Sequence, residues 1–239
     1  MAAFTIASAS LPGRTGRGVR IAVVDSGIHA AHPHVCGISG GIAFRDHGGV
    51  SCDVVDRLGH GTAVAAAIRE KAPDVELIAV KVFDRALAAS GRALAEAIRW
   101  AASQQVALIN LSLGTANPEH EASLTAAAHE AEARGVLIVA AATQADTRWL
   151  PGALPRVVAV DADWSRDRHT CEVHQLPDGS LRLRASPYPR PIPGVPPERN
   201  LKGLSFAVAN ATGLLALAIE GAAVRTTNDL LLRLTEVHC

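Results

Sequence analysis

Three short stretches place the residues of a nucleophile, a base and an orienting acid at the ends of predicted elements. Asp25 ends the apolar run "RIAVVD", and His60 opens "HGTAVAAAIRE". Ser205 lies in "LKGLSFAVANATG", where a run of small residues predicts a buried helix. A serine hydroxyl is a poor nucleophile near neutral pH. A neutral imidazole can take its proton, and a buried carboxylate can fix the tautomer of that imidazole.

Each of the three residues also has an ordinary structural interpretation. Asp25 can cap the turn after its strand, and His60 can be a first-turn residue with no chemical role. Ser205 can be an N-cap that accepts hydrogen bonds from the first free N–H groups of the helix. Only the sequence around all three residues, in this order, favours a catalytic set.

The elements predicted to position these side chains alternate between strands and helices. Buried strands are predicted at 20–25, 75–83, 106–114, 136–142 and 156–160, and helices at 60–70, 90–104, 118–135, 205–219 and 226–236. This alternation predicts an α/β three-layer sandwich, with a mostly parallel twisted sheet and helices on both faces. Functional residues gather at the carboxyl ends of such strands, which is where Asp25 stands.

The segment 163–200 interrupts this alternation. It is polar and rich in proline, and we expect an extended surface segment with a hairpin around "LPDGSLRLR". The chain shows no internal repeat and no low-complexity linker. We therefore expect one domain over residues 1–239.

Composition excludes several classes of function. The chain has 239 residues, 49% of them hydrophobic, so it can bury a large core. Its formal net charge is zero and it has no basic stripe, which argues against nucleic acid as a partner. No apolar run reaches the roughly 18 residues of a membrane span, and the N-terminus lacks a secretory pattern. We expect no membrane partner and a cytoplasmic location; the sequence does not predict the oligomeric state.

The cysteines and clustered histidines give no metal motif. Cys36, Cys52, Cys171 and Cys239 form no CxxC pair, and free thiols are favoured over a Cys36–Cys52 bridge, although the sequence leaves that bridge open. Three histidines are close in sequence, His29, His32 and His34, but their spacing is poor for a metal site.

The local sequences resemble those of the subtilisin-like serine proteases, the subtilases, over roughly residues 18–220. The stretches that carry the resemblance are "IAVVDSGIHAAHP" (21–33), "HGTAVAAAI" (60–68), "INLSLG" (109–114), "GVLIVAAATQ" (135–144) and "GLSFAVANATGLLAL" (203–217). The resemblance implies a subtilisin-like fold. It also implies that Ser205 is the nucleophile, His60 the general base and then acid, and Asp25 the orienting carboxylate.

The resemblance further implies a substrate site and an oxyanion hole. An extended polypeptide would add as a strand along Ser112, Leu113 and Gly114, flanked by residues 85–91, and Ala141 and Ala142 would line the substrate pocket. Asp146, near the pocket wall, would favour a basic side chain before the cut. The Gln144 side chain and the Ser205 backbone N–H would donate to the oxyanion.

The sequence departs from the family pattern at several positions. Gln144 replaces an asparagine, Leu204 a threonine, and Ala209 a proline. The insertion that holds calcium in secreted members is missing, and His34 stands where an acidic ligand is expected. We therefore expect no metal and no cofactor. Because the resemblance begins by residue 18, we also expect that this chain holds no pro-domain.

The resemblance implies a serine endopeptidase that cleaves extended polypeptides through an acyl-enzyme. The small size of the chain, together with the expected lack of a calcium insertion and a pro-domain, suggests a dedicated processing protease, for example one that removes the leader of a ribosomally made peptide. Two alternatives stay open. Gln144, Leu204 and Ala209 are compatible with a pseudo-protease that binds peptides without cutting them, and nothing separates hydrolysis from transpeptidation or macrocyclisation.

Overall fold

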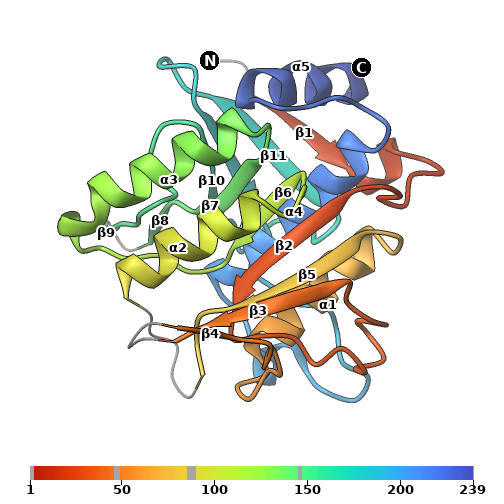
Figure 1. Cartoon of the computed structure of the whole chain (residues 1–239). Helices are drawn as coiled ribbons and strands as arrows, with labels where there is room; N and C mark the ends of the chain where they lie inside the picture. The colour runs from red at the N-terminus through yellow and green to blue at the C-terminus, as the bar shows by residue number, and fades with distance from the viewer. Residues whose placement is uncertain (1–2, 46–48, 85–89, 145–146, 239) are drawn as a thin grey trace.

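A ten-stranded sheet forms the middle layer of the molecule (Figure 1). The computed structural model describes residues 3–45, 49–84, 90–144 and 147–238. The strand order is β1-β11-β12-β10-β7-β6-β2-β5-β3-β4. The bounds are β1 Ala3–Ala7, β2 Arg20–Asp25, β3 Gly40–Phe44, β4 Val50–Ser51, β5 Glu76–Lys81, β6 Leu108–Leu111, β7 Leu137–Ala141, β10 Val157–Ala162, β11 Thr170–Gln175 and β12 Leu181–Ala185.

The central part of this sheet is parallel, as the alternating pattern predicts. Strand β2 pairs in parallel with β5 and β6, and the parallel pairing continues through β7 and β10 to β12. Antiparallel pairing occurs towards the two edges, where β4 joins β3 and β11 joins both β12 and β1. The central strands are buried on both faces, which is why they read as continuous apolar runs.

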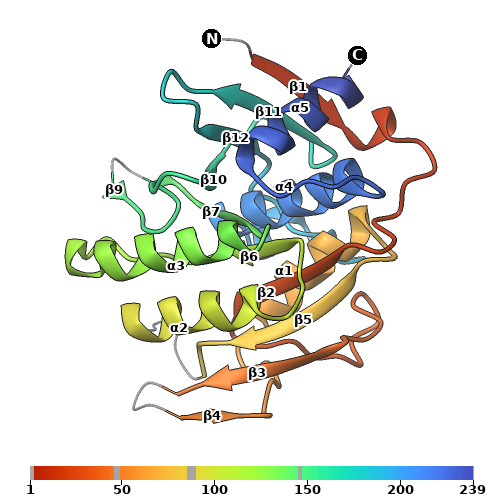
Figure 2. The same cartoon turned by 45° about the horizontal axis from the view of Figure 1, so that its top comes forward.

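Helices cover both faces of the sheet, so the three-layer prediction is confirmed (Figures 1 and 2). One face carries α2 (Gly91–Ala102) and α3 (Glu121–Ala133), and the other carries α1 (His60–Lys71) and α4 (Leu204–Ile219). Helix α5 (Thr227–His238) packs against α4 and β1. The hydroxyl of Ser90 accepts a hydrogen bond from the Ala93 N–H and so caps α2.

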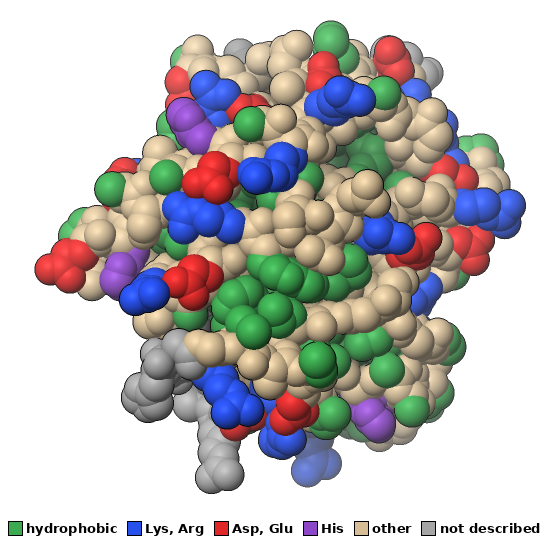
Figure 3. Space-filling view, viewed as in Figure 1, with side chains coloured by type: hydrophobic (Ala, Val, Ile, Leu, Met, Phe, Trp, Pro, Cys, Tyr) green, Lys and Arg blue, Asp and Glu red, His purple; other side chains and the backbone are tan. Residues whose placement is uncertain are grey.

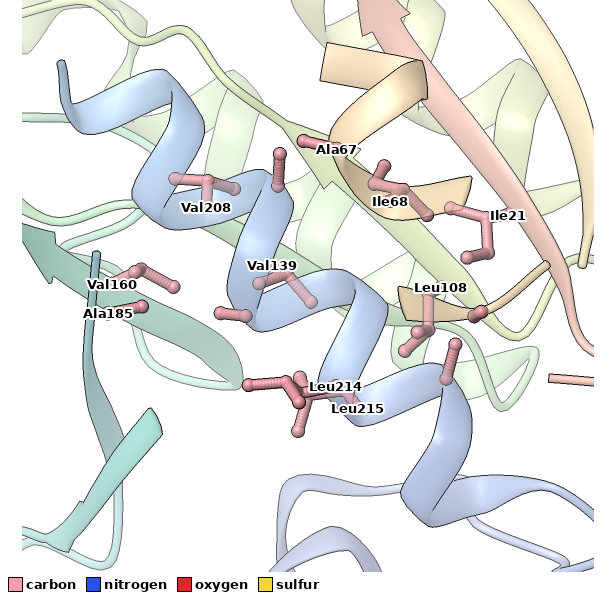
Figure 4. Packing of buried hydrophobic residues seen from close by; sticks show 14 of the residues in the cluster. Ile21, Ala67, Ile68, Leu108, Val139, Val160, Ala185, Val208, Leu214 and Leu215 are labelled. Carbon is pink, nitrogen blue, oxygen red and sulfur yellow. The ribbon is translucent and has the colours of Figure 1, made fainter. Parts of the chain in front are cut away.

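Helix α4 lies in the core and is buried on all sides. Val208, Leu214 and Leu215 are among its side chains that pack against the sheet and α1 (Figure 4). A helix that is apolar all round can only be stable when other elements cover it completely. The core therefore fixes where α4 begins, and Ser205 lies in that first turn.

Several elements at the sheet edges differ from the sequence prediction. Strands β1, β3 and β4 were not predicted: β1 and β3 pair with strands that are distant in sequence, and β4 has only two residues. The predicted hairpin is confirmed as β11 and β12. Cys36, Cys52 and Cys171 are free thiols, which confirms the prediction of free thiols over a Cys36–Cys52 bridge. Cys239 lies outside the described residues. No helix in the described part is long and apolar enough to cross a membrane.

Candidate active site

Asp25 and His60 form a hydrogen-bonded pair at the carboxyl end of β2. The Asp25 Oδ1 and His60 Nδ1 atoms are 2.7 Å apart, and the Asp25 side chain is fully buried. The same Oδ1 accepts the Ser26 N–H, whereas Oδ2 is buried and accepts no hydrogen bond from the described residues. A carboxylate in this position holds the imidazole with Nδ1 protonated and leaves Nε2 free to act as a base.

The beginning of α1 is fixed against the end of β2 by Ser26 and Asp56. The Ser26 hydroxyl accepts the Gly61 N–H and donates to Asp56 Oδ1. The Asp56 carboxylate also accepts backbone N–H groups of Leu58, Gly59 and Thr62, so it replaces a side-chain N-cap. A negative charge at a helix N-terminus is favourable. The sequence analysis missed both residues, because their partners are evident only in three dimensions.

Close approach of the two elements also requires glycine at position 61. A Cβ atom on Gly61 would lie 2.2 Å from the Gly27 carbonyl oxygen and 3.1 Å from Asp25 Cβ. Any side chain here would push α1 away from β2. The pair Asp25–His60 therefore depends on the glycine that follows the histidine.

The surroundings of His60 change its pKa in opposite directions. Burial by itself lowers the pKa of the imidazole, whereas the hydrogen bond and charge of Asp25 and the charge of Asp56 raise it. The raising effects prevail, and the pKa of His60 lies above its ordinary value. The neutral, base-competent form of His60 is therefore populated at higher pH than for a free histidine.

Ser205 is the second residue of α4 and is not its N-cap. Gly203 precedes the helix with a φ of 147°, a conformation that favours glycine, and no side chain caps the helix. The Ser205 hydroxyl donates to the Ser112 carbonyl oxygen, 3.0 Å away. The N-cap interpretation of Ser205 is therefore wrong, because its oxygen does not serve the helix N–H groups.

The residue after Ser205 contacts His60, although the hydrogen bond that the predicted catalytic set requires is not formed. The ring of Phe206, which follows the serine, has its centroid 5.8 Å from that of His60. Within the described chain no hydrogen bond joins the Ser205 hydroxyl to His60, since the hydroxyl points to Ser112. Proton transfer to His60 needs a rotation of the serine side chain.

A buried chain of hydrogen bonds holds the first turn of α4 on β6. The Ser112 hydroxyl donates to the Ser205 carbonyl and accepts from the Asn110 side-chain amide, at 3.0 and 2.9 Å. Asn110 in turn accepts from the Thr212 hydroxyl. This chain fixes the backbone that carries Ser205, and the sequence analysis did not identify Asn110 or Thr212.

Replacing Asn110 with leucine is expected to lower kcat by about 10- to 100-fold, because the Ser205 backbone loses its fixed position. It should also lower the free energy of unfolding by about 1–3 kcal/mol, since two buried hydroxyls lose a partner. Steady-state kinetics and urea denaturation measure the two effects. Ser186→Ala is the control, because the Ser186 hydroxyl is buried without a partner among the described residues. An unchanged kcat in Asn110→Leu would contradict the positioning role.

The segment 149–152 contacts both parts of the predicted substrate site, the stretch after Ser112 and the residues Ala141 and Ala142. The backbone N–H of Trp149 donates to the Ala142 carbonyl, 3.1 Å away, and Leu150 pairs with Thr115. A Cβ atom on Gly152 would lie 1.9 Å from the Ala141 carbonyl oxygen, so the backbones are in direct contact. This segment therefore holds the stretch after Ser112 close to the end of β7.

The Trp149 indole fills the space beside Gly114. A Cβ atom on Gly114 would lie 3.4 Å from both Cβ and Cε3 of Trp149. The indole Nε1 is buried and has no hydrogen-bond partner among the described residues. The sequence analysis missed Trp149, because no motif marks it and it joins the site only through its contact with Gly114.

Some predicted site residues lie outside the described residues. These are the side chain of Gln144, Asp146 and residues 85–89 of the predicted flanking segment. The Gln144 backbone belongs to β8 (Thr143–Gln144), which pairs with β9 (Thr147–Arg148). No group of three or more His, Cys, Asp or Glu residues in the described ranges is arranged to hold a metal ion. The roles of Gln144 and of Asp146, and the absence of metal, stay predictions.

A buried Asp–His pair at the carboxyl edge of a parallel sheet, next to a serine in the first turn of an adjoining helix, is typical of a serine hydrolase. The chain order Asp, His, Ser narrows that class to the subtilisin type.

Comparison with known proteins identifies the family. A model of the subtilase family matches residues 16–163, which include Asp25 and His60 but end before Ser205. Subtilisin Savinase of Lederbergia lenta is 33% identical over 222 residues, covering 88% of this chain and 77% of that protein. An alkaline protease of Alkalihalobacillus alcalophilus is also 33% identical over 88% of this chain, which spans 54% of its length. The chain belongs to the subtilase family.

Two solved structures share the fold. Sphericase has a TM-score of 0.71 and 25% identity, over 93% of this chain and 83% of its own. A cold adapted subtilisin-like serine proteinase has a TM-score of 0.67 and 21% identity, over 91% of this chain and 81% of its own.

Proposed function

We propose that this protein is a serine endopeptidase that cleaves extended polypeptides through an acyl-enzyme. The observation that carries the proposal is the 2.7 Å contact between Asp25 Oδ1 and His60 Nδ1, with Ser205 in the adjoining first turn of α4. Ser205 attacks the peptide carbonyl, and His60 takes the serine proton and then delivers it to the leaving amine. The buried Asp25 stabilises the imidazolium formed between these steps.

The Ser112 carbonyl couples substrate binding to the position of Ser205. A polypeptide that adds as a strand along Ser112–Gly114 offers backbone N–H groups to carbonyls on this edge. The Ser112 carbonyl at present accepts the Ser205 hydroxyl. When a substrate N–H occupies that carbonyl, the hydroxyl is released to turn towards His60.

The test of the proposed function is covalent labelling with a fluorophosphonate probe. The wild-type protein is expected to react, and Ser205→Ala is expected not to react. Asn210→Ala is a useful comparison, because Asn210 is a buried polar residue of the same helix that binds the Ser186 and Tyr188 carbonyls. Wild-type protein that is folded but unlabelled would reject the endopeptidase.

Gln144 is proposed to share the oxyanion hole with the Ser205 backbone N–H. Replacing Gln144 with alanine is expected to lower kcat by about 10²–10³-fold with little change in KM, because one donor to the transition state is lost. Gln144→Asn, which keeps the amide, should retain far more activity than the alanine variant. Peptidase kinetics measure both variants. Equal losses in the two would show that the amide does not reach the oxyanion.

The proposed enzyme acts as a processing protease with few targets. Support comes from Trp149, whose indole contacts Gly114 at the end of the predicted substrate strand. In this position the indole would take space that a substrate side chain could otherwise occupy. A pocket narrowed in this way admits small side chains before the cut. Removal of a leader from a ribosomally made peptide is such a task, and a cytoplasmic location would suit it. Digestion of casein at rates typical of broad-specificity subtilisins would contradict this role.

Trp149→Ala is expected to widen the accepted side chains. In a set of fluorogenic peptides that differ only before the cut, the wild type should prefer alanine or glycine. The variant should raise kcat/KM for leucine and phenylalanine by about tenfold or more, because a side chain of similar area is newly buried. Trp164→Ala is the control, since Trp164 is 55% exposed and packs on Tyr188 away from Gly114. An unchanged preference in Trp149→Ala would show that the indole does not limit the pocket.

One observation favours a second candidate, a module that binds peptides without cutting them. The Ser205 hydroxyl is bound to the Ser112 carbonyl and not to His60. The labelling test separates the two candidates, since the binding module would not react. If labelling occurs, mass spectrometry of the products separates hydrolysis from transpeptidation or macrocyclisation.

A further inference from the structure

A cavity of about 470 Å³ lies next to the candidate active site, between the loop that follows β2, the beginning of α1 and the segment 189–201. These three segments meet in the lower part of Figure 1. The helix contributes the face that carries Thr62, Ala63 and Ala66, and Gly59 lines the cavity immediately before His60. Asn200 and Leu201 line it a few residues before Ser205. The cavity therefore reaches both chain segments that carry the proposed catalytic residues.

Apolar side chains that are left exposed gather around this cavity. Ile192, Val195 and Leu201 are 45%, 37% and 50% exposed, and all three line it. Figure 3 shows a further group of hydrophobic side chains near the middle of the face that it displays. Large apolar side chains around a hollow favour an occupant with an apolar side chain of its own.

The cavity also carries two arginines whose charge is not neutralised by a neighbour. Neither the Arg190 nor the Arg199 side chain has a hydrogen bond or ion pair with any residue in the described part of the chain. A planar guanidinium binds a carboxylate through two parallel hydrogen bonds. Free guanidinium groups above an apolar floor indicate an occupant that also carries a carboxylate.

The remaining polar groups of the cavity do not cancel this charge. Asp56 is the acid in its lining; its two oxygens accept hydrogen bonds from Ser26, Thr62 and the backbone before α1, and it forms no ion pair with Arg190 or Arg199, so the two guanidinium charges exceed its single negative charge. Burial, with the charges of Arg190 and His32, lowers the pKa of His34, so this imidazole is neutral near pH 7. His29 and His32 complete the rim.

The predicted substrate strand does not line this cavity. Ser112, Gly114 and Trp149 are not among its lining residues, whereas the neighbours of His60 and Ser205 are. A polypeptide bound along Ser112–Gly114 up to the scissile bond continues past Ser205 and His60 with its leaving part. We expect that part of the chain to meet the cavity, which reaches the neighbourhood of His60 at Gly59.

We propose that this cavity binds the leaving part of the substrate, and that it selects peptides with an acidic residue beside an apolar one shortly after the cut. The inference rests on the proposed endopeptidase function. Arg190 and Arg199 bind the carboxylate, and Ile192, Val195 and Leu201 cover the apolar side chain. The cavity would thus restrict which residues are accepted after the scissile bond, in addition to the restriction that Trp149 places on the side chain before it.

The test uses internally quenched peptides that are identical up to the cut and carry Glu, Gln or Lys at one of the first four positions after it. In the wild type we expect kcat/KM for the best Glu peptide to exceed that for its Lys counterpart by about tenfold or more, as for one charge-assisted contact. The double variant Arg190→Glu/Arg199→Glu should reverse this ratio. Arg92→Glu/Arg134→Glu, with the same change of net charge on α2 and after α3, is the matched control and should keep the wild-type ratio.

Fluorophosphonate labelling of the same preparations distinguishes failure of the cavity proposal from failure of the proposed endopeptidase function. If the wild type is labelled and cleaves all peptides with a Glu/Lys ratio near one, the cavity inference is overturned and the endopeptidase stands. If the wild type is neither labelled nor active, both are rejected. Should the glutamate variants not fold, as judged by circular dichroism, Arg190→Gln/Arg199→Gln must abolish the Glu preference.

Discussion

Replacing Ser205 with alanine is expected to lower kcat by about 10⁶-fold, while KM for a good peptide changes little. The loss is this large because the acyl-enzyme can no longer form, whereas the binding surfaces remain. The backbone carbonyl of Ser205 accepts a hydrogen bond from the Ser112 hydroxyl, a contact that does not need the serine side chain, so the variant should keep its fold. Progress curves with a sensitive fluorogenic peptide measure the residual rate.

The proposed transfer of the Ser205 proton to His60 leads to a further expectation. His60→Ala alone should lower kcat nearly as far as Ser205→Ala, and the double variant should be little worse than either single variant. Residues that act as one unit show such non-additive losses. Independent losses that multiply in the double variant would show that Ser205 and His60 do not act together, despite the neighbouring first turn of α4.

Asp25→Asn is expected to lower kcat by about 10⁴-fold. The asparagine has almost the same shape, but it offers no charge to the imidazolium and allows the wrong tautomer of His60. The 2.7 Å contact between Asp25 Oδ1 and His60 Nδ1 is the geometric reason to expect this loss. Asp161→Asn is the control, because Asp161 is also an acid at the end of a parallel strand but pairs with Arg182, on the far side of β7. A loss below tenfold would show that Asp25 does not orient His60.

The same substitution is expected to change the pH dependence. The pKa of His60 is raised above its ordinary value of 6.5, and His60 must be neutral to accept the serine proton. Activity should therefore rise with pH through a midpoint above 6.5 in the wild type. Asp25→Asn removes the negative charge and with it the charge-assisted hydrogen bond, which together raise this pKa, so the midpoint should move to lower pH. Residual activity or probe labelling between pH 5 and 9 measures both curves.

The interaction between Asp25 and His60 should also make the free energy of unfolding depend on pH. A histidine whose pKa is raised on folding stabilises the folded state fully below pH 6.5, and this contribution is lost as pH rises through the folded value. Asp25→Asn should thus destabilise the protein more at pH 5.5 than at pH 9. An equal effect at both values would mean that the Asp25 charge does not interact with His60.

The sequence by itself determined the arrangement of the layers and the identity of the candidate triad. Apolar runs of strand length, separated by helices with a buried face, allow few architectures other than a parallel sheet covered on both sides. Asp25, His60 and Ser205 were identified because each lies at an element boundary inside a motif of consecutive residues. Such motifs consist of consecutive residues, so they can be identified without knowing which residues are in contact in the fold.

Only the tertiary structure decided how the site is held together and what limits it. The roles of Ser26 and Asp56, and the chain from Ser112 through Asn110 to Thr212, depend on partners that are far apart in sequence or on different elements. The edge strand β1 likewise exists only through its pairing with β11.

The same holds for the direction of the Ser205 hydroxyl, the position of Trp149 beside Gly114 and the cavity that holds Arg190 and Arg199. Each of these follows from close packing between elements, in which the free energy depends on distance and direction in space. Residue type and spacing specify neither, so a sequence pattern can name the reacting groups but not their alignment or the shape of the site around them.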